Sequence, residues 1–309
     1  MGGGVKMPAF KMPMMKRQQK EVLLGYAFAS PWLIGFFAFT IIPLLTSMYY
    51  SFTNYNTLNQ PEFVGLSNYS FLIFNDPLFW RSLGNTLFHV ALATPFSLVL
   101  GILVALVLNA PVKGLGIWRT IFYLPNVVSS VAMALLWVWL FNKDYGLINE
   151  FLALFGIESI NWLGDPNIVK VSLILMGAWG SGITALFFLG AIKGIPKELY
   201  EVAAIAGTSK TSQFYKITLP MITPTILFML ITTIIGAFQM FTLAYIMTSG
   251  GPDRASYYLG YYLFDKGIME KQMGYASAIS WIMFSLVLLI IFVIFKSSKK
   301  WVFYLGSNS

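Results

Sequence analysis

The chain has 309 residues, of which 57% are hydrophobic and 10% are charged, and its mean hydropathy is +0.72. Soluble domains carry about a quarter charged residues, so the composition indicates one polytopic membrane domain and leaves no room for an additional soluble ATPase. The absence of cysteine excludes disulfides and thiol chemistry. The net charge of +8 comes from basic residues beside apolar stretches, so we expect no nucleic-acid partner.

Residues 1–20 form a basic tail without acidic residues. Its basic residues are Lys6, Lys11, Lys16, Arg17 and Lys20. A glycine run and two prolines near the start favour disorder in this tail. The small residues Ala27 and Ala29 resemble a signal-peptide cleavage site, but the apolar run continues to Tyr50. We therefore interpret residues 23–50 as an uncleaved first span.

Six stretches contain no Asp, Glu, Lys or Arg and are near or above the roughly 20 residues that cross a bilayer. They are 23–50, 83–108, 121–141, 171–192, 221–247 and 275–295. The sequence therefore predicts an all-α membrane protein with six transmembrane helices, in which prolines within the spans introduce kinks. The predicted domains are the basic tail, 1–20, and a transmembrane domain, 21–309.

Basic residues are divided unequally between the two sides of such a topology. The N-terminus, the loops 109–120 and 193–220 and the C-terminus hold 14 of the 20 Lys and Arg residues but 3 of the 12 Asp and Glu residues. Basic residues near span ends favour the cytoplasmic side of a bilayer. We therefore expect a multi-pass protein of the cytoplasmic (inner) membrane with both termini inside.

The three loops on the opposite side are 51–82, 142–170 and 248–274. They are longer than a helix connection requires, and each contains aromatic and turn residues. From the residues alone, these outer loops are either an ordered cap over the span ends or a docking surface for an extracytoplasmic solute receptor.

A polar segment, 196–220, separates the fourth and fifth predicted spans. Pro196 suits the first turn of a short helix and Gly207 suits its end. The apolar residues between them are Leu199, Val202, Ala203 and Ile205. We expect a loop rich in Thr and Ser to follow, and then an aromatic-basic run, 213–216. The simpler interpretation is a solvated loop, but an amphipathic pattern with small residues at fixed spacing is unusual for one.

Segment 196–220 resembles the EAA loop of the membrane subunits of ABC importers, which reads Glu-Ala-Ala, then Gly after three residues, then Ile-x-Leu-Pro after nine more. The matching residues are Glu201, Val202, Ala203, Gly207, Ile217, Leu219 and Pro220. Val202 replaces an Ala, and Ala206 stands where many members carry Asp; neither change removes the small-faced helix. Further motifs resemble the carbohydrate-uptake branch, which includes the maltose and glycerol-phosphate permeases. They are FVGLSNY (63–69), LPNVVSS (124–130), FNKDYGLIN (141–149) and TSGGPDRAS (248–256).

The resemblance implies a type I ABC importer transmembrane domain that carries a sugar or oligosaccharide by alternating access. Its implied partners are a second homologous permease subunit, two cytoplasmic ATPase subunits and an extracytoplasmic solute-binding protein, which favours docking for the outer loops. The helix after Pro196 would enter a cleft of an ATPase subunit, with Glu201 as the anchor. The implied ATPase-coupling residues are Glu201, Ala203, Ala204, Gly207, Ile217, Leu219 and Pro220.

ATP and Mg²⁺ would bind to the partner ATPase. This sequence has no Gly-rich phosphate-binding loop that ends in Lys and Ser or Thr. We therefore expect no cofactor, metal or enzymatic activity on this chain.

Sugars need polar groups that match hydroxyls and flat apolar faces, and two predicted spans contain that mixture. These residues are Gly177, Trp179, Gly180, Ser181, Gly182 and Thr184 in the fourth span and Thr232, Thr233, Gly236, Gln239 and Thr242 in the fifth. Small residues in membrane helices more often serve close helix packing. The resemblance to the maltose permease instead implies a substrate pathway, in which we also place Gln239 by its position. Its implied residues are Trp179, Gly180, Ser181, Thr184, Thr233, Gly236, Ala237 and Met240. Because Gly, Ala or Met replace several polar contacts of that permease, a roomier cavity is implied.

Two other kinds of transporter are the alternatives. Ion-coupled carriers and channels usually keep charge at membrane depth or show paired interrupted segments, and neither is evident in the sequence. His89 is the only histidine, and helix packing is its simpler role. An ABC importer permease for another polar solute would share the EAA loop, but the neutral, aromatic-containing spans and outer motifs favour carbohydrate.

Overall fold

The computed structural model describes residues 17–110 and 114–304, with side chains from residue 21 onward. Residues 1–16 of the predicted basic tail, and the disorder expected there, lie outside the described residues. The chain divides into two compact units, Met1–Tyr49 and Tyr50–Ser309.

The first unit is a long apolar helix with one irregular turn. It consists of α1 (Arg17–Phe36), the π-helical turn η1 (Phe37–Ile41) and most of α2 (Ile42–Ser51). Glu21–Ser51 is a 31-residue apolar segment, long enough to cross a bilayer, in agreement with the predicted first span. Phe28 and Phe39 expose 85% and 84% of their surface, so this helix suits contact with lipid or another apolar surface.

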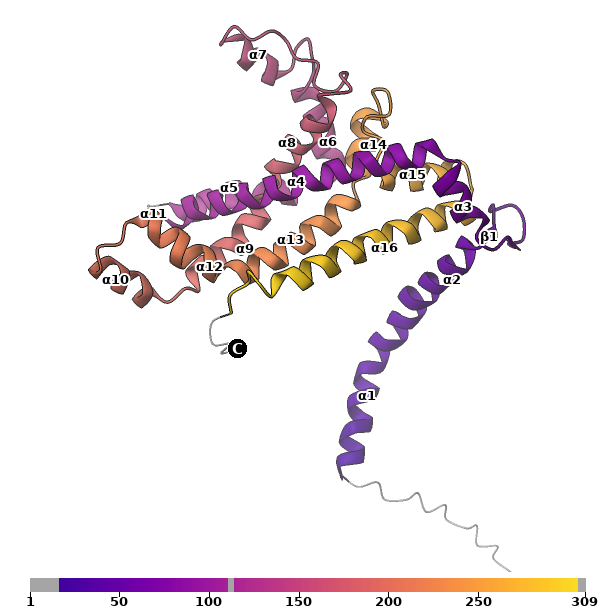
Figure 1. The fold of residues 1–309 in the computed structure, drawn as a ribbon, viewed down its shortest axis with the longest axis horizontal. Coiled ribbons are helices and arrows are strands. Elements are labelled where there is room, and N and C mark those ends of the chain that lie inside the picture. Colours follow the sequence, from indigo (N-terminus) through magenta and orange to yellow (C-terminus); the bar gives the residue numbers. More distant parts are fainter. Residues whose placement is uncertain (1–16, 111–113, 305–309) are drawn as a thin grey trace, which may run out of the picture. The chain divides into compact units, whose positions relative to one another are not determined.

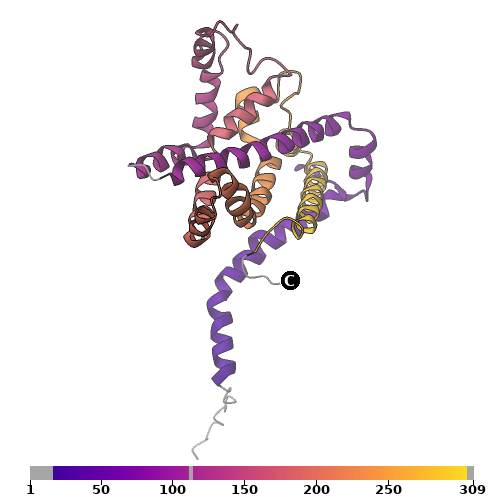
Figure 2. The same ribbon diagram turned by 60° about the vertical axis from the view of Figure 1, so that its left-hand side comes forward.

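The second unit is almost entirely helical (Figures 1 and 2). A short antiparallel hairpin, β1 (Thr53–Asn54) and β2 (Glu62–Phe63), is the only sheet among the described residues. Helices α4 (Pro77–Asn109) and α16 (Met273–Ser298) are unbroken spans of 33 and 26 residues. The other elements are α3 (Ser67–Phe74), α5 (Leu115–Tyr123), η2 (Leu124–Val127), α6 (Ser130–Leu140), α7 (Leu147–Ala153), α8 (Val169–Trp179), α9 (Gly182–Lys193), α10 (Lys197–Ile205), α11 (Lys210–Gln213), η3 (Phe214–Thr218), α12 (Leu219–Met221), α13 (Thr223–Phe238), α14 (Thr242–Thr248), α15 (Leu259–Phe264) and η4 (Asp265–Met269).

Helix α4 is the element around which the second unit packs. It begins where Asp76 caps it, since Oδ1 accepts N–H bonds from Leu78 (2.9 Å) and Phe79 (3.2 Å). Helices α8, α9 and α13 pack along it (Figure 1). The approach of α9 is close, because a Cβ at Gly101 would lie 2.6 Å from Cγ2 of Thr184. Helix α4 thus brings the fourth and fifth spans together.

Three of the predicted spans are bent pairs of helices. The third bends by 100° between Leu115–Val127 and α6, the fourth by 48° between α8 and α9, and the fifth by 64° between Lys210–Met221 and α13. Pro125 lies in the turn η2, and Gly180 ends α8; both residue types favour helix ends. Kinks expected at prolines thus occur near Pro125 and Pro224, whereas the bend at Gly180 was not predicted. The fifth also ends early, at Phe238, and α14 follows as a separate helix.

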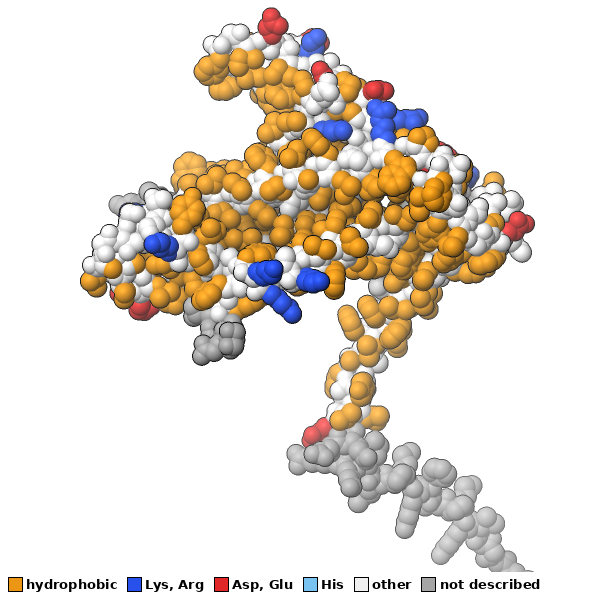
Figure 3. All heavy atoms as spheres, in the orientation of Figure 1, with side chains coloured by type: hydrophobic (Ala, Val, Ile, Leu, Met, Phe, Trp, Pro, Cys, Tyr) orange, Lys and Arg blue, Asp and Glu red, His pale blue; other side chains and the backbone are white. Residues whose placement is uncertain are grey.

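The fold class agrees with the sequence analysis. The protein is all-α apart from the hairpin, and the described residues hold three unbroken candidate spans, or up to six when each bent pair counts as one. Figure 3 shows hydrophobic side chains over most of the visible surface of α4, α13 and α16, with Lys and Arg near the helix ends. That surface is suited to the interior of a bilayer.

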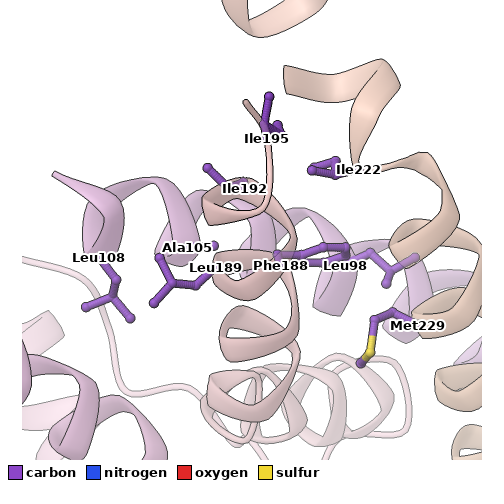
Figure 4. Close-up of a cluster of buried hydrophobic side chains, with 9 residues drawn as sticks. All are labelled: Leu98, Ala105, Leu108, Phe188, Leu189, Ile192, Ile195, Ile222 and Met229. Carbon is purple, nitrogen blue, oxygen red and sulfur yellow. The ribbon is translucent and has the colours of Figure 1, made fainter. Parts of the chain in front are cut away.

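A buried apolar cluster ties segment 196–220 to the long helices (Figure 4). Its members come from α4, α9, α13 and both ends of the segment: Leu98, Ala105, Leu108, Phe188, Leu189, Ile192, Ile195, Ile222 and Met229. Ile195 and Ile222 flank the segment and expose 6% and 0% of their surface. Because interiors are close-packed, a displacement of the segment must also displace α9 and α13.

The outer loops are held in place by side-chain hydrogen bonds. Asn149 donates to the backbone carbonyl of Ile160 (2.9 Å) and accepts a bond from Nε1 of Trp162 (2.9 Å). The carboxylate of Asp76 accepts bonds from the hydroxyls of Tyr262 and Tyr275. Burial alone would raise the pKa of Asp76, but these bonds and the two backbone N–H groups lower it below its usual value. The loops are therefore ordered, and a docking role for them stays a prediction.

Candidate functional site

A cavity of about 490 Å³ lies where α4, α8, α9 and α13 meet. Its volume is in the range of pockets that hold small molecules. Most of its lining is apolar, and none of the described residues that line it is Asp, Glu, Lys or Arg. The lining residues are His89, Ala93, Ser97, Leu173, Ile174, Gly177, Ala178, Ile183, Thr184, Phe187, Phe228, Met229, Thr232, Thr233, Gly236, Ala237, Met240 and Leu243.

Several polar side chains in this lining have no hydrogen-bond partner within the described chain. They are His89 and Ser97 of α4, Thr184 of α9 and Thr233 of α13. In contrast, the hydroxyl of Thr232 donates to the carbonyls of Phe228 (3.0 Å) and Met229 (3.2 Å), as hydroxyls in apolar helices often do. The hydroxyls of Ser97, Thr184 and Thr233 are therefore available to a ligand or to water in the cavity, whereas Nδ1 of His89 is covered by the protein.

The cavity collects part of the predicted substrate pathway. Five of the predicted residues line it: Thr184, Thr233, Gly236, Ala237 and Met240. Four lie outside the lining: Trp179, Gly180, Ser181 and Gln239. The ring of Trp179 packs edge-on against Trp137 at 5.6 Å, and Gln239 is the exposed residue that ends α13. The pathway roles of all nine stay predictions.

Gly180 and Ser181 form the break between α8 and α9, and Gly182 explains why the helix can restart there. A Cβ at Gly182 would lie 1.9 Å from the backbone oxygen of Phe122, a distance that no side chain tolerates. The first turn of α9 can therefore approach α5 only because this residue is glycine. The bend of 48° at this break sets α8 at an angle to α9. Thr184, in the first turn of α9, then lies at the cavity wall.

Sequence reasoning did not place α4 in the site. His89, Ala93 and Ser97 all line the cavity from this helix. Their spacing of four residues puts them on one helical face, and this spacing is the sequence feature that could have indicated a site on α4. Phe187 and Phe228 were also missed; their rings lie 5.6 Å apart at the cavity wall, as flat apolar faces.

The lining of the cavity suits the binding of a small molecule. Its lining supplies hydroxyls, one imidazole and apolar faces, and no carboxylate or amine. No group of three or more His, Cys, Asp or Glu residues that could hold a metal ion occurs in the described part of the chain. The site therefore suits a neutral polar molecule.

Segment 196–220 begins with the amphipathic helix α10, which ends at Gly207 as the sequence predicts. Gly207 adopts a left-handed conformation with φ of 74°. The N–H of Thr208 donates to the carbonyl of Ala203 (2.9 Å), and the N–H of Gly207 donates to that of Ala204 (3.0 Å). This pair of bonds is a Schellman motif, which explains the need for glycine.

The expected Thr- and Ser-rich loop after Gly207 is shorter than predicted. Ser209 accepts an N–H bond from Ser212 (3.3 Å) and caps α11, so helical structure resumes at Lys210. The aromatic-basic run that follows, 213–216, lies in helical turns. We did not recognise this capping serine in the sequence.

Helix α10 has one anchored face and one free face. Tyr200 and Ile217 pack against the buried cluster of Figure 4, and the Tyr200 hydroxyl lies 2.9 Å from Oγ1 of Thr218. On the other side, Val202 and Ile205 expose 67% and 89% of their surface. Exposed Glu201 has no ion pair or hydrogen bond to another described residue. The apolar residues predicted as a stripe thus point largely to the outside of this unit.

The remaining predicted coupling residues lie on either side of this helix end. Ala203 is half-buried and Ala204 is exposed, and Leu219 and Pro220 are half-buried in α12. Small residues at these positions leave the backbone of α10 accessible to a partner. Their coupling roles stay predictions.

A helical membrane domain with a neutral cavity between its spans and an anchored amphipathic helix at one end defines a transport permease. The chain belongs to the family described as "Binding-protein-dependent transport system inner membrane component", which matches residues 97–302. It is therefore a permease subunit of the ABC importer class and an inner membrane component.

Relatives of known name match nearly the full chain. It is 40% identical to the probable ABC transporter permease protein YesP of Bacillus subtilis, over 93% of this chain and 94% of that protein. It is 32% identical to the trehalose/maltose transport system permease protein MalF of Thermococcus litoralis, over 92% and 96%.

Solved structures show the same fold. The chain superposes with a TM-score of 0.81 and 25% identity on a bacterial ABC transporter that imports the acidic polysaccharide alginate, over 92% of this chain and 99% of that one. A second structure of a bacterial alginate ABC transporter, in complex with an alginate pentasaccharide-bound periplasmic protein, gives a TM-score of 0.82 at 25% identity, over 92% and 96%. The expectation of a type I ABC importer fold is thus confirmed.

Proposed function

We propose that this permease subunit carries a neutral sugar or oligosaccharide through the cavity between α4, α8, α9 and α13. The observation that carries the proposal is the cavity lining, which combines unpaired hydroxyl and imidazole groups with phenyl rings and no charged residue. Sugars present hydroxyls on apolar ring faces and match such a lining. The relatives named for trehalose, maltose, lactose and arabino-oligosaccharides support this substrate class.

Because the described lining contains no charged residue, the cavity suits a neutral sugar better than an acidic one. The structural relative is a transporter of the acidic polysaccharide alginate. A carboxylate in a cavity without a cationic partner would lose its hydration without compensation. A neutral substrate is therefore favoured for this chain.

ATP hydrolysis on partner subunits supplies the energy in this proposal, and the chain itself binds neither ATP nor Mg²⁺. The exposed face of α10, with Glu201 beside Val202 and Ile205, supports docking to an ATPase subunit. Ala203, Ala204 and Gly207 would allow the close approach. Because Tyr200 and Ile217 pack on the buried cluster, movement of α10 would shift α9 and α13, and with them the cavity wall.

The complete importer in this proposal has a second homologous permease, two ATPase subunits and an external solute-binding protein. Segment 196–220 faces the cytoplasm, together with both termini, as the distribution of basic residues favours. The ordered outer loops then face the binding protein. The periplasmic protein bound in the alginate transporter structure supports such a partner.

Uptake into proteoliposomes that contain the assembled complex tests the proposed function. A panel of labelled maltose, trehalose, lactose and arabinotriose would be compared with an alginate oligosaccharide and with histidine. We expect ATP-dependent uptake of at least one neutral sugar and none of the acidic sugar or the amino acid. Uptake of only the charged solutes, or sugar uptake that proceeds equally without ATP, would contradict the proposal.

A further inference from the structure

We propose that His89 is a specificity-determining residue of the cavity, whose neutral imidazole binds one hydroxyl of the transported sugar. This inference rests on the proposed function and assigns a role to a residue for which the sequence favoured mere helix packing. It follows from the position of the ring, from its lack of a partner and from the character of its surroundings.

The position of His89 places its ring in the cavity wall. The residue lies within α4, exposes 6% of its surface and lines the cavity together with Ala93 and Ser97 on the same helical face. It is not an isolated core residue, because the cavity adjoins it.

The imidazole has no hydrogen-bond partner in the described chain. Its Nδ1 atom is unpaired and is covered by the protein, so a hydrogen bond to a molecule in the cavity would be made by Nε2. Buried polar groups in native proteins nearly always have a partner, so an exception calls for a ligand or a function. The demand is stronger within a membrane span, where polar side chains are rare and usually face a pathway. A packing role alone would be served as well by Phe or Leu.

The surroundings hold the ring in a defined orientation. The ring of Tyr258 lies 5.3 Å from that of His89 at an interplanar angle of 58°. The Tyr258 hydroxyl is itself buried without a partner, and Tyr258 does not line the cavity. Tyr258 therefore fixes the imidazole by packing and offers nothing to the ligand in this conformation.

A neutral imidazole matches the chemistry of a sugar hydroxyl. Nε2 of a neutral imidazole either donates or accepts a hydrogen bond, depending on the tautomer, and a hydroxyl can supply the complementary partner. Ser97, Thr184 and Thr233 can bond to other hydroxyls from the same wall. A site with a buried polar group positioned to bond a hydroxyl binds an analogue without that hydroxyl poorly, because the polar group is then left unpaired. His89 should therefore discriminate among sugars at one ring position.

The test measures uptake by the assembled complex in proteoliposomes, with the sugar from the panel above that the wild type transports and with its monodeoxy analogues. We expect His89→Phe to lower kcat/KM for the parent sugar by about threefold to tenfold, the effect of one hydrogen bond. We expect it to reduce the wild type's preference over one particular deoxy analogue. His89→Gln, which keeps a donor and an acceptor, should retain most of that preference.

Tyr258→Phe is the matched control. It removes an unpaired hydroxyl and keeps the ring, so uptake and selectivity should stay at the wild-type level. If the wild type transports no sugar, the proposed function fails and this inference fails with it. If the wild type transports sugar and both His89 variants keep its full preference among the deoxy analogues, the inference alone is overturned. If the His89→Phe complex does not assemble, His89→Gln is compared with His89→Leu instead, and the inference is overturned if these two variants show the same preference among the deoxy analogues.

Discussion

Replacing Gly182 with alanine should destabilise the permease, because this glycine is where α9 meets the backbone of α5. The added Cβ would lie 1.9 Å from the carbonyl oxygen of Phe122 and 2.7 Å from its carbonyl carbon. Both are backbone atoms, so a rotamer change cannot relieve the overlap and one of the helices must shift. Overpacking of this kind typically costs about 1–3 kcal/mol, and a contact this short belongs at the upper end.

Gly190 of the same helix provides the matched control. A Cβ there would meet nothing within 4 Å. Alanine in a helix interior is about 0.5–1 kcal/mol more favourable than glycine, so Gly190→Ala should leave stability unchanged or raise it. Thermal unfolding of both purified variants in one detergent separates the two effects. If Gly182→Ala unfolds at the wild-type temperature, the close approach of α9 to α5, and with it the bent fourth span, is refuted.

Three further predictions concern other parts of the molecule. Glu201→Lys should weaken ATPase association by about 2–5 kcal/mol while membrane insertion continues, since it reverses a charge at the docking face; normal co-purification of the ATPase would exclude that role. Asp76→Asn should lower stability at neutral pH. Because the folded pKa of Asp76 is lowered, its contribution is present above the unfolded value of about 3.9 and is lost as the pH falls through the folded pKa, so the difference from wild type should shrink below about pH 4 in acid-unfolding curves. Cysteines introduced at Lys210 and Asn161 of this cysteine-free chain should react with an impermeant reagent from opposite sides of intact cells; labelling of both from outside would contradict the topology.

The spans could be predicted from the sequence because a helix that crosses a bilayer needs about 20 apolar residues without charge. The sequence did not show the bend at Gly180 or how sharp the bends near Pro125 and Pro224 are, since these depend on contacts between distant segments. The close approach of Gly182 to Phe122, for example, requires knowledge of which helices are neighbours. In the sequence, Gly180 and Gly182 could equally indicate a small-residue packing face within a straight helix.

Helix α10 was more predictable than the cavity. The end of α10 at Gly207 is a local matter of backbone conformation, and the spacing of glycine after the apolar stripe was sufficient. The cavity instead gathers residues from four helices, and only the fourth and fifth spans had been considered. His89, Ala93 and Ser97 were missed because a helical face becomes a site only when its neighbours leave space beside it.

In the proposed function, sugar passes through this cavity and bonds to its unpaired hydroxyls. The most direct measurement compares ATP-dependent sugar uptake by complexes that carry Thr233→Val or Thr232→Val. The two threonines are adjacent and both line the cavity, but only the hydroxyl of Thr232 is already bonded to its own helix. Our account predicts that uptake falls severalfold in Thr233→Val and stays near the wild-type rate in Thr232→Val, with both complexes assembled. Equal uptake by the two variants at the wild-type rate would contradict it.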